Sequence, residues 1–214
     1  MVRRAVLIAL IALVAIPLAA QAPAGLKTRP DASGTLKFAP TEKGFAVTGG
    51  PGIVFDPANT VKPIYRVRAT FTQTKKSDTN AYYGLFFGGN GMDGAAPEYV
   101  YFGIAQDGSF IIRHRVGDKI DEMDKSLHYA IRKPDANGKA VNVLDVQVAP
   151  TGVSYVVNGA VVDATPTRSA IAANSFTTLE KIGGIAGVRV DAPVDVQVDG
   201  FLVQSPFQLN DRGQ

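Results

Sequence analysis

The stretch from Ala81 to Val203 most constrains the fold, because it is an unbroken series of short β-strand patterns separated by turns. In chain order it contains YYGLFFGG, YVYFGIAQDGSFIIRHRVGDK, VNVLDVQVAPTGVSYVVNGAVVD and GGIAGVRVDAPVDVQVDGFLV. Alternating apolar and polar residues are typical of antiparallel strands with one face buried. Few chemically reactive side chains occupy the turns. The pattern therefore predicts a β-sandwich and does not by itself indicate an enzyme.

The first two dozen residues predict export. A short basic start precedes an apolar run from Ala5 to Leu18, which has the length of a signal-peptide core and is too short to span a bilayer. Small residues follow, and cleavage is expected after Ala20 or Ala24. We therefore predict a signal peptide at residues 1–24 and a periplasmic or secreted protein. An uncleaved membrane anchor is the alternative.

The composition of the mature chain argues against several partner classes. The full chain has 22 Lys+Arg and 19 Asp+Glu, and removal of Arg3 and Arg4 leaves 20 basic against 19 acidic residues. A net charge this close to zero is not typical of a nucleic-acid-binding protein. No membrane partner is expected after signal cleavage. The absence of cysteine excludes a disulfide framework and a lipid-modified N-terminal cysteine.

The rest of the chain is predicted to form one domain. Residues 25–35 are polar and predict a linker, residues 36–205 a β-sandwich, and residues 206–214 a C-terminal tail. About a dozen strands are predicted, at Leu36–Phe38, Phe45–Thr48, Ile53–Phe55, Ile64–Thr72, Tyr82–Phe87, Tyr99–Ala105, Ser109–Val116, Asn142–Ala149, Val153–Val157, Ala160–Val162, Ile185–Val190 and Val194–Val203. Residues 167–181 are the one stretch with a weak helical pattern.

Two turns and one β-bulge are predicted from the sequence between and within these strands. Asp107-Gly108 and Asn158-Gly159 each lie between alternating runs and predict hairpins, the second with a type I′ turn. The alternation of the last strand slips at Gly200, which predicts a β-bulge. We expect an all-β, two-sheet antiparallel jelly-roll sandwich. An eight-stranded up-and-down barrel is the alternative. It fits less well because more than eight strands are predicted.

Two hairpins carry a resemblance to a known family. They read Y-x-Y-F…DG-x-F-x-I-x-R at Tyr99–Arg113 and V-x-Y-x-V-N-G at Val153–Gly159. With the segments around them, over residues 45–203, they resemble exported bacterial proteins with a concanavalin A-like (laminin-G-like) jelly roll. Within that group the chain is similar to the domains described as 3-keto-disaccharide hydrolase-like. The resemblance implies a fold, and no active-site motif of the family is recognisable here.

One acidic pair is a candidate for catalysis. Glycosidases need two carboxylates at close range, and concanavalin A-like glucanases place them on alternate residues of one strand as E-x-D-x-x-E. Glu122-Met123-Asp124 matches the first half of this pattern, but no second glutamate follows. The flanking residues are polar, so the segment is interpreted as a charged loop or edge.

Metal chemistry has little support in the sequence. His114 and His128 are the only histidines, and we expect His114 to be hydrogen-bonded and partly buried. No cofactor is expected, apart from calcium bound by loop oxygens. The candidate calcium ligands are Asn90, Asp93 and Asp107, although they do not form a ligand loop of fixed spacing.

A tyrosine and arginine surface is the most specific candidate for ligand binding. Tyr99 and Tyr101 share one face of their strand, and Arg113 and Arg115 share one face of the strand predicted to pair with it. Aromatic rings and planar guanidinium groups suit an oligosaccharide or an acidic glycan. The alternative is that the tyrosines belong to the core and the arginines to the solvated face.

Three functions remain open at this point. The first is an exported, non-catalytic module that binds a carbohydrate or another envelope component. The second is a glycan-processing hydrolase with an unrecognised site, which the resemblance suggests and the residues do not. The third is a structural or protein-interaction module.

Overall fold

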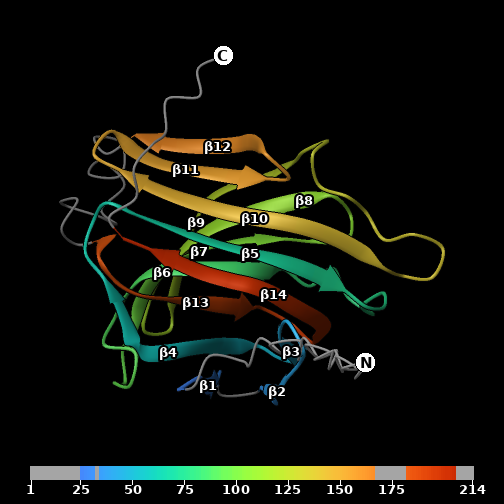
Figure 1. The fold of residues 1–214 in the computed structure, drawn as a ribbon, viewed down its shortest axis with the longest axis horizontal. Helices are drawn as coiled ribbons and strands as arrows, with labels where there is room; N and C mark the ends of the chain where they lie inside the picture. The colour runs from blue at the N-terminus through green and yellow to red at the C-terminus, as the bar shows by residue number, and fades with distance from the viewer. Residues whose placement is uncertain (1–24, 32–33, 167–181, 206–214) are drawn as a thin grey trace, which may run out of the picture.

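The computed structural model describes residues 25–31, 34–166 and 182–205, and these form two stacked antiparallel sheets of seven strands each (Figure 1). Sheet A has the order β1 (Lys27–Pro30), β4 (Gly52–Val61), β13 (Gly184–Val190), β6 (Tyr83–Asn90), β7 (Glu98–Ile104), β8 (Ser109–Val116) and β9 (Lys119–Leu127). Sheet B has the order β12 (Ala160–Pro166), β11 (Gly152–Val157), β10 (Ala140–Ala149), β5 (Tyr65–Gln73), β14 (Val194–Gln204), β3 (Gly44–Gly49) and β2 (Lys37–Pro40). The predicted fold class is confirmed, and two separate sheets replace the alternative of one closed barrel.

The main core lies between the two sheets and is built from alternate residues of both. Tyr83 and Phe71 pack with ring centroids 5.9 Å apart, and Tyr155 packs on Phe102 at 5.3 Å and on Phe87 at 6.2 Å. All five side chains are at most 2% exposed. Burial of each such side chain contributes roughly 1.5–3 kcal/mol, so this layer supplies the stability that a cysteine-free chain needs.

The predicted turns are confirmed in detail. Asn158 has a φ of 52° and Gly159 a φ of 88°, as a type I′ turn requires. The Asn158 side chain also accepts a hydrogen bond from the Val143 amide at 2.9 Å and donates one to the Ala130 carbonyl at 2.7 Å. The bulge at Gly200 is present as well, because the pairing of β14 with β5 shifts register between Asp199 and Leu202.

Two segments differ from their prediction. Residues 25–35 were expected to form a linker, but Lys27–Pro30 forms β1, which pairs with β4 at the edge of sheet A. Lys119–Leu127, absent from the predicted strands and interpreted as a loop or edge, forms the strand β9, which confirms the edge position and excludes the loop. Its charged residues resemble the pattern that protects edge strands from further pairing.

Several predictions fall on residues that the structure does not describe. They are the signal peptide at 1–24, the helical pattern at 167–181 and the C-terminal tail at 206–214. In the part of the chain that is described, no helix has the length and apolar character needed to cross a membrane.

Candidate functional site

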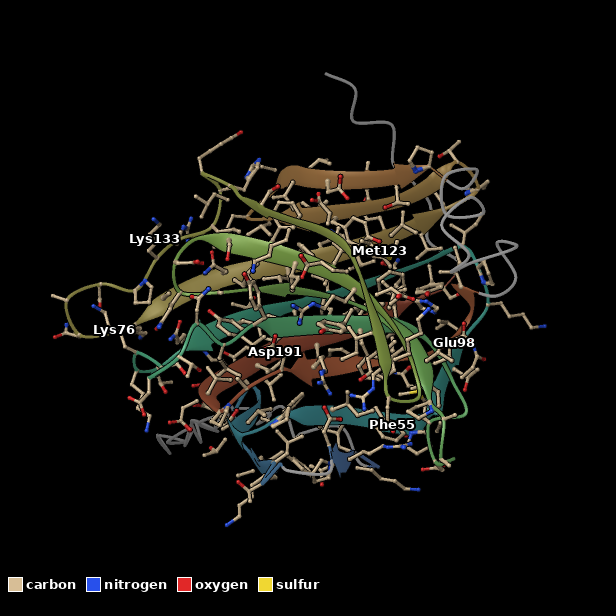
Figure 2. All side chains as sticks on the ribbon, turned by 180° about the vertical axis from the view of Figure 1, so that it is seen from behind. Phe55, Lys76, Glu98, Met123, Lys133 and Asp191 are labelled. Atoms are coloured by element: carbon tan, nitrogen blue, oxygen red, sulfur yellow. The ribbon has the colours of Figure 1, made fainter. Side chains whose placement is uncertain are left out.

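The outer face of sheet A, which points away from sheet B, carries a second buried apolar cluster. Figure 2 shows this side of the molecule, with Asp191 near the middle of the face and Phe55 on β4. The cluster consists of Ile53, Phe55, Tyr82, Phe86, Met92, Tyr99, Tyr101, Ala105 and Ile111. The outer face of an antiparallel sheet is commonly solvated and polar. A buried aromatic layer there is additional to what the sandwich core requires.

The four residues predicted for ligand binding meet on this face. Tyr99 lies opposite Arg115, and Tyr101 lies opposite Arg113, in the pairing of β7 with β8. Nη1 of Arg113 donates a hydrogen bond to the Tyr101 hydroxyl at 3.2 Å, and Nη1 of Arg115 donates one to the Tyr99 hydroxyl at 3.5 Å. The sequence thus placed these side chains together correctly.

The tyrosines are buried, as the alternative interpretation expected, but the arginines do not form the solvated face that it also expected. Tyr99 and Tyr101 are each 1% exposed, so neither ring offers an open face to a ligand. They nevertheless lie outside the core between the sheets. The Arg113 and Arg115 side chains are 24% and 12% exposed, so they are not a solvated face either. We call the buried rings of Tyr99 and Tyr101 the tyrosine floor. The side chains of Arg113 and Arg115 lie over it.

Four further charged groups complete an arginine and carboxylate network, which we call the arginine cluster. It comprises Arg113, Arg115 and Arg189 with Asp31, Glu122 and Asp191. Nη2 of Arg113 lies 3.0 Å from the Glu122 carboxylate, and Nη1 lies 3.5 Å from Asp191. The Arg189 guanidinium carbon lies 5.5 Å from the centre of the Tyr101 ring, in the range of a cation–π contact.

The ion pairs of the arginine cluster show that the outer face of sheet A is concave. Arg115 on β8 binds Asp31, which follows β1, although four strands separate β8 from β1 in the sheet. In a flat sheet these strands would be about 24 Å apart, which is beyond the reach of the two side chains. Arg113 similarly reaches Asp191, just after β13, across β6 and β7. The sheet therefore curves so that its two flanks approach each other over the tyrosine floor.

Two carboxyl groups of the arginine cluster have pKa values shifted in opposite directions. Burial raises the pKa of Asp31, but hydrogen bonds and charge from Arg189 and Arg115 outweigh this effect and leave the pKa below its ordinary value. For Asp191 burial dominates, and its pKa is raised despite a hydrogen bond from the Tyr82 amide and the nearby charge of Arg113. The concave face therefore combines a firmly ionised carboxylate with one that is easier to protonate.

Sequence reasoning missed half of the arginine cluster. Arg189 had a recognisable signal, because it is a charged residue inside an otherwise apolar strand. Tyr82–Phe87 is apolar on both faces, and this pattern could have indicated a second buried layer on the outer side of the sheet. Asp31 and Asp191 gave no signal, since one lies in the expected linker and the other in an ordinary turn.

The candidate catalytic pair does not form. Glu122 lies opposite Arg113, whereas Asp124 lies opposite Ile112, because the pairing of β8 with β9 shifts register between these positions. Ile112 belongs to the core between the sheets, so Asp124 points to the inner side and Glu122 to the outer side. The bulge breaks the two-residue alternation on which the E-x-D prediction depended.

The candidate calcium ligands do not converge. Asn90 ends β6 next to Glu98, whereas Asp107 lies in the turn after β7, at the opposite end of the same strand pair. Asp93 follows Asn90 in the next turn. The Asp107 carboxylate already accepts hydrogen bonds from the Ser109 amide, the Ser109 hydroxyl and Asn80. No group of three or more potential metal-binding side chains occurs among the residues with described positions.

His114 has the role expected from its position. It is 4% exposed, and its Nε2 lies 3.1 Å from the Glu98 carboxylate. It is a packed, hydrogen-bonded side chain.

Two open cavities flank the concave face. One of about 210 Å³ lies at the β1 side and is lined by Lys27, Thr28, Arg29, Phe55, Met92 and Asp93. The other, of about 460 Å³, is lined by Lys76, Asn80, Gln106, Asp107, Lys133 and Pro134. Phe55 and Met92 belong to the outer aromatic cluster, so the first cavity is continuous with the floor of the face. Lys76 and Lys133 mark the second cavity in Figure 2.

Comparison with known proteins identifies the fold. No protein-family model and no curated protein matches the chain. Among solved structures, the carbohydrate-binding module CBM66 from Bacillus subtilis matches with a TM-score of 0.60 at 10% identity, over 85% of this chain and 96% of that one. A Bacillus subtilis protein of unknown function with a galectin-like fold gives 0.60 at 12% identity, over 84% and 88%. A β-fructofuranosidase from Aspergillus kawachii gives 0.53 at 12% identity, over 82% of this chain and 28% of the enzyme.

These likenesses define the class of structure. The chain is a galectin-like, jelly-roll β-sandwich, as expected for a concanavalin A-like fold. Similarity at this level of identity establishes the fold and leaves function to be argued from the site.

Proposed function

We propose that this protein is an exported, non-catalytic module that binds a glycan on the concave outer face of sheet A. The observation that supports the proposal is the arginine cluster. It lies over the buried tyrosine floor, on a face of sheet A that takes no part in the packing between the two sheets. Removal of several charges from water is costly unless they are well paired. A face with only a structural role needs no such arrangement.

The chemistry of the face suits a saccharide. Sugar hydroxyls both donate and accept hydrogen bonds, and paired guanidinium and carboxylate groups present donors and acceptors side by side. Arg113 illustrates this arrangement, since its guanidinium lies between Glu122 and Asp191. The fold shared with a carbohydrate-binding module supports the same proposal.

A glycan array with two matched variants tests this function. Arg113→Ala removes one arginine from the concave face. Arg66→Ala removes an arginine from the outer face of sheet B, where it forms a bidentate pair with Asp145. We expect Arg113→Ala to abolish the array signal and Arg66→Ala to leave it. The reverse pattern would move the site to sheet B, and no binding to any glycan would favour a structural or protein-interaction module.

One observation keeps a glycan-processing hydrolase as the second candidate. Asp191 and Glu122 contact the same guanidinium, and burial raises the pKa of Asp191. A carboxyl group with a raised pKa close to a second carboxyl group is the arrangement used for glycoside hydrolysis. Release of reducing sugar from an array-positive glycan would support this candidate, provided that Asp191→Asn abolishes it. Binding without turnover supports the non-catalytic module.

Export remains part of the proposal. We propose that residues 1–24 are removed and that the mature protein is periplasmic or secreted. N-terminal sequencing of the protein from its native host should give a start near residue 21 or 25. A full-length product in the cytoplasm would contradict this.

A further inference from the structure

The arginine cluster contains a complete carboxylate-binding site. Nη1 and Nη2 of Arg189 donate to the two carboxylate oxygens of Asp31 at 3.1 and 2.7 Å. Nη1 of Arg115 donates to the first of these oxygens at 2.8 Å. Bidentate arginine recognition of a carboxylate is geometrically specific. Arg189 is only 3% exposed, so its orientation is fixed before any ligand arrives.

The carboxylate in this site is supplied from a weakly attached part of the fold. Asp31 directly follows β1, a strand of four residues whose backbone pairs only with β4 and whose Arg29 side chain donates to the Met92 carbonyl. Beyond it, the Asp31 amide donates to the Pro51 carbonyl, and the Gly34 amide donates to the Asp31 carbonyl. Short edge segments with few bonds open at low free-energy cost. The Asp31 side chain is also 22% exposed, so an external carboxylate has access to the same arginines.

Asp31 does not satisfy the arginines fully. Nε of Arg189 is buried and has no hydrogen-bond partner among the described residues. Nη2 of Arg115 lies 3.9 Å from the fully exposed Asp118 carboxylate, which is too far for a hydrogen bond. Buried donors are nearly always paired in native structures. These spare donors fit a ligand that brings more acceptor oxygens than one aspartate does.

We propose that the concave face recognises an acidic saccharide, a glycan containing a uronic acid, and that Asp31 occupies the position of the sugar carboxylate in the free protein. This inference rests on the proposed glycan-binding function and adds the ligand class. The sugar carboxylate replaces Asp31 between Arg115 and Arg189, and its ring and hydroxyl oxygens accept from the spare donors.

The test compares an acidic oligosaccharide with its own methyl ester. Calorimetric titrations of the protein with trigalacturonate and triglucuronate are each matched by the fully methyl-esterified trisaccharide, which keeps the sugar and removes the charge. We expect at least one acid to bind at least tenfold more tightly than its ester. The tighter binding should weaken as salt is added, because it depends on charge.

Two variants locate the effect. Asp31→Asn removes the internal carboxylate with little change of shape, and we expect it to tighten binding of the acid severalfold while leaving the ester unchanged. Arg189→Lys removes the guanidinium group that can donate to both oxygens of one carboxylate. This variant should bind the acid about tenfold more weakly. The wild-type comparison of acid with ester remains decisive if either variant fails to fold.

The outcomes separate this inference from the proposed function. Equal binding of acid and ester, or binding of neutral array glycans alone, overturns the acidic-saccharide inference and leaves the glycan-binding function standing. Acid binding that Arg189→Lys does not affect also overturns it. Failure of every glycan, acidic and neutral, removes both proposals.

Discussion

The two faces of sheet A are both buried, yet they are built differently. The inner face packs apolar side chains such as Leu85 and Phe102 against sheet B. The outer face also has an aromatic layer, but arginines and carboxylates cover it. Among the described residues, the one buried arginine and the one buried aspartate are Arg189 and Asp145, and both lie on outer faces. Burial alone therefore does not separate the inner core of sheet A from the candidate site on its outer face.

The largest expected effect belongs to the inner face. Phe102→Ala removes a fully buried ring that packs on Tyr155 and on Phe110, at centroid distances of 5.3 and 6.2 Å. The free energy of unfolding should fall by about 3–5 kcal/mol, from lost burial and the cavity left behind. Urea unfolding followed by circular dichroism measures this. A loss below about 1 kcal/mol would show that the inner layer is not the main stabilising core.

Loss of the charge on Asp31 should have the next largest effect. Asp31→Asn leaves Arg115 and Arg189 without their carboxylate, and we expect a loss of about 1–3 kcal/mol. Because the pKa of Asp31 is lowered by folding, its stabilisation is present above about pH 4, the unfolded value, and disappears as the pH falls through the folded value. The difference between wild type and Asp31→Asn should therefore shrink below about pH 4. A difference that is constant with pH would exclude the ionic contribution.

The type I′ turn provides a test that involves neither face. Gly159→Val places a β-branched residue at a φ of 88°, where nothing lies within 4 Å of the added Cβ. The loss of about 1 kcal/mol or more would come from the backbone alone. Gly159→Asn is the control, since asparagine tolerates positive φ better. Equal melting temperatures for all three proteins would contradict the assigned turn.

Tyr101→Phe measures the contribution of the Tyr101 hydroxyl separately from that of its ring. It removes the acceptor for Arg113 and keeps the ring, so stability should fall by about 1 kcal/mol. Glycan binding should weaken because Arg113 loses one of its supports. The Tyr101→Ala variant should weaken binding further, at least severalfold. If it instead unfolds the protein, the outer layer is structural.

The smallest effect is expected at Asp191, and it has the opposite sign to that at Asp31. The pKa of Asp191 is raised by folding, so this group favours the fold below its unfolded value of about 4 and loses that contribution as the pH rises through the folded value. Asp191→Asn should therefore raise the melting temperature slightly at pH 7, and the gain should vanish near pH 4. A lower melting temperature at pH 7 would show that the contact with Arg113 outweighs the cost of burial.

The fold was more predictable from the sequence than the site. Alternation and the Asp107-Gly108 and Asn158-Gly159 turns are local signals, and they gave the hairpins correctly. They also placed Tyr99 and Tyr101 beside Arg113 and Arg115, because register follows from the turn. Asp31 and Arg189 are 158 residues apart in sequence, and no local pattern indicates their contact. The curvature that joins them arises from the whole sheet.

Heteronuclear NMR of the labelled protein, titrated with the glycan that gives the strongest array signal, tests the central claim most directly. The account predicts that amide shifts concentrate on β7, β8 and β13 of sheet A, around Tyr101, Arg113 and Arg189, with little change around Arg66 and Asp145 on sheet B. Shifts confined to sheet B or to the loops at the ends of the sandwich would contradict the claim that the concave face of sheet A is the binding site.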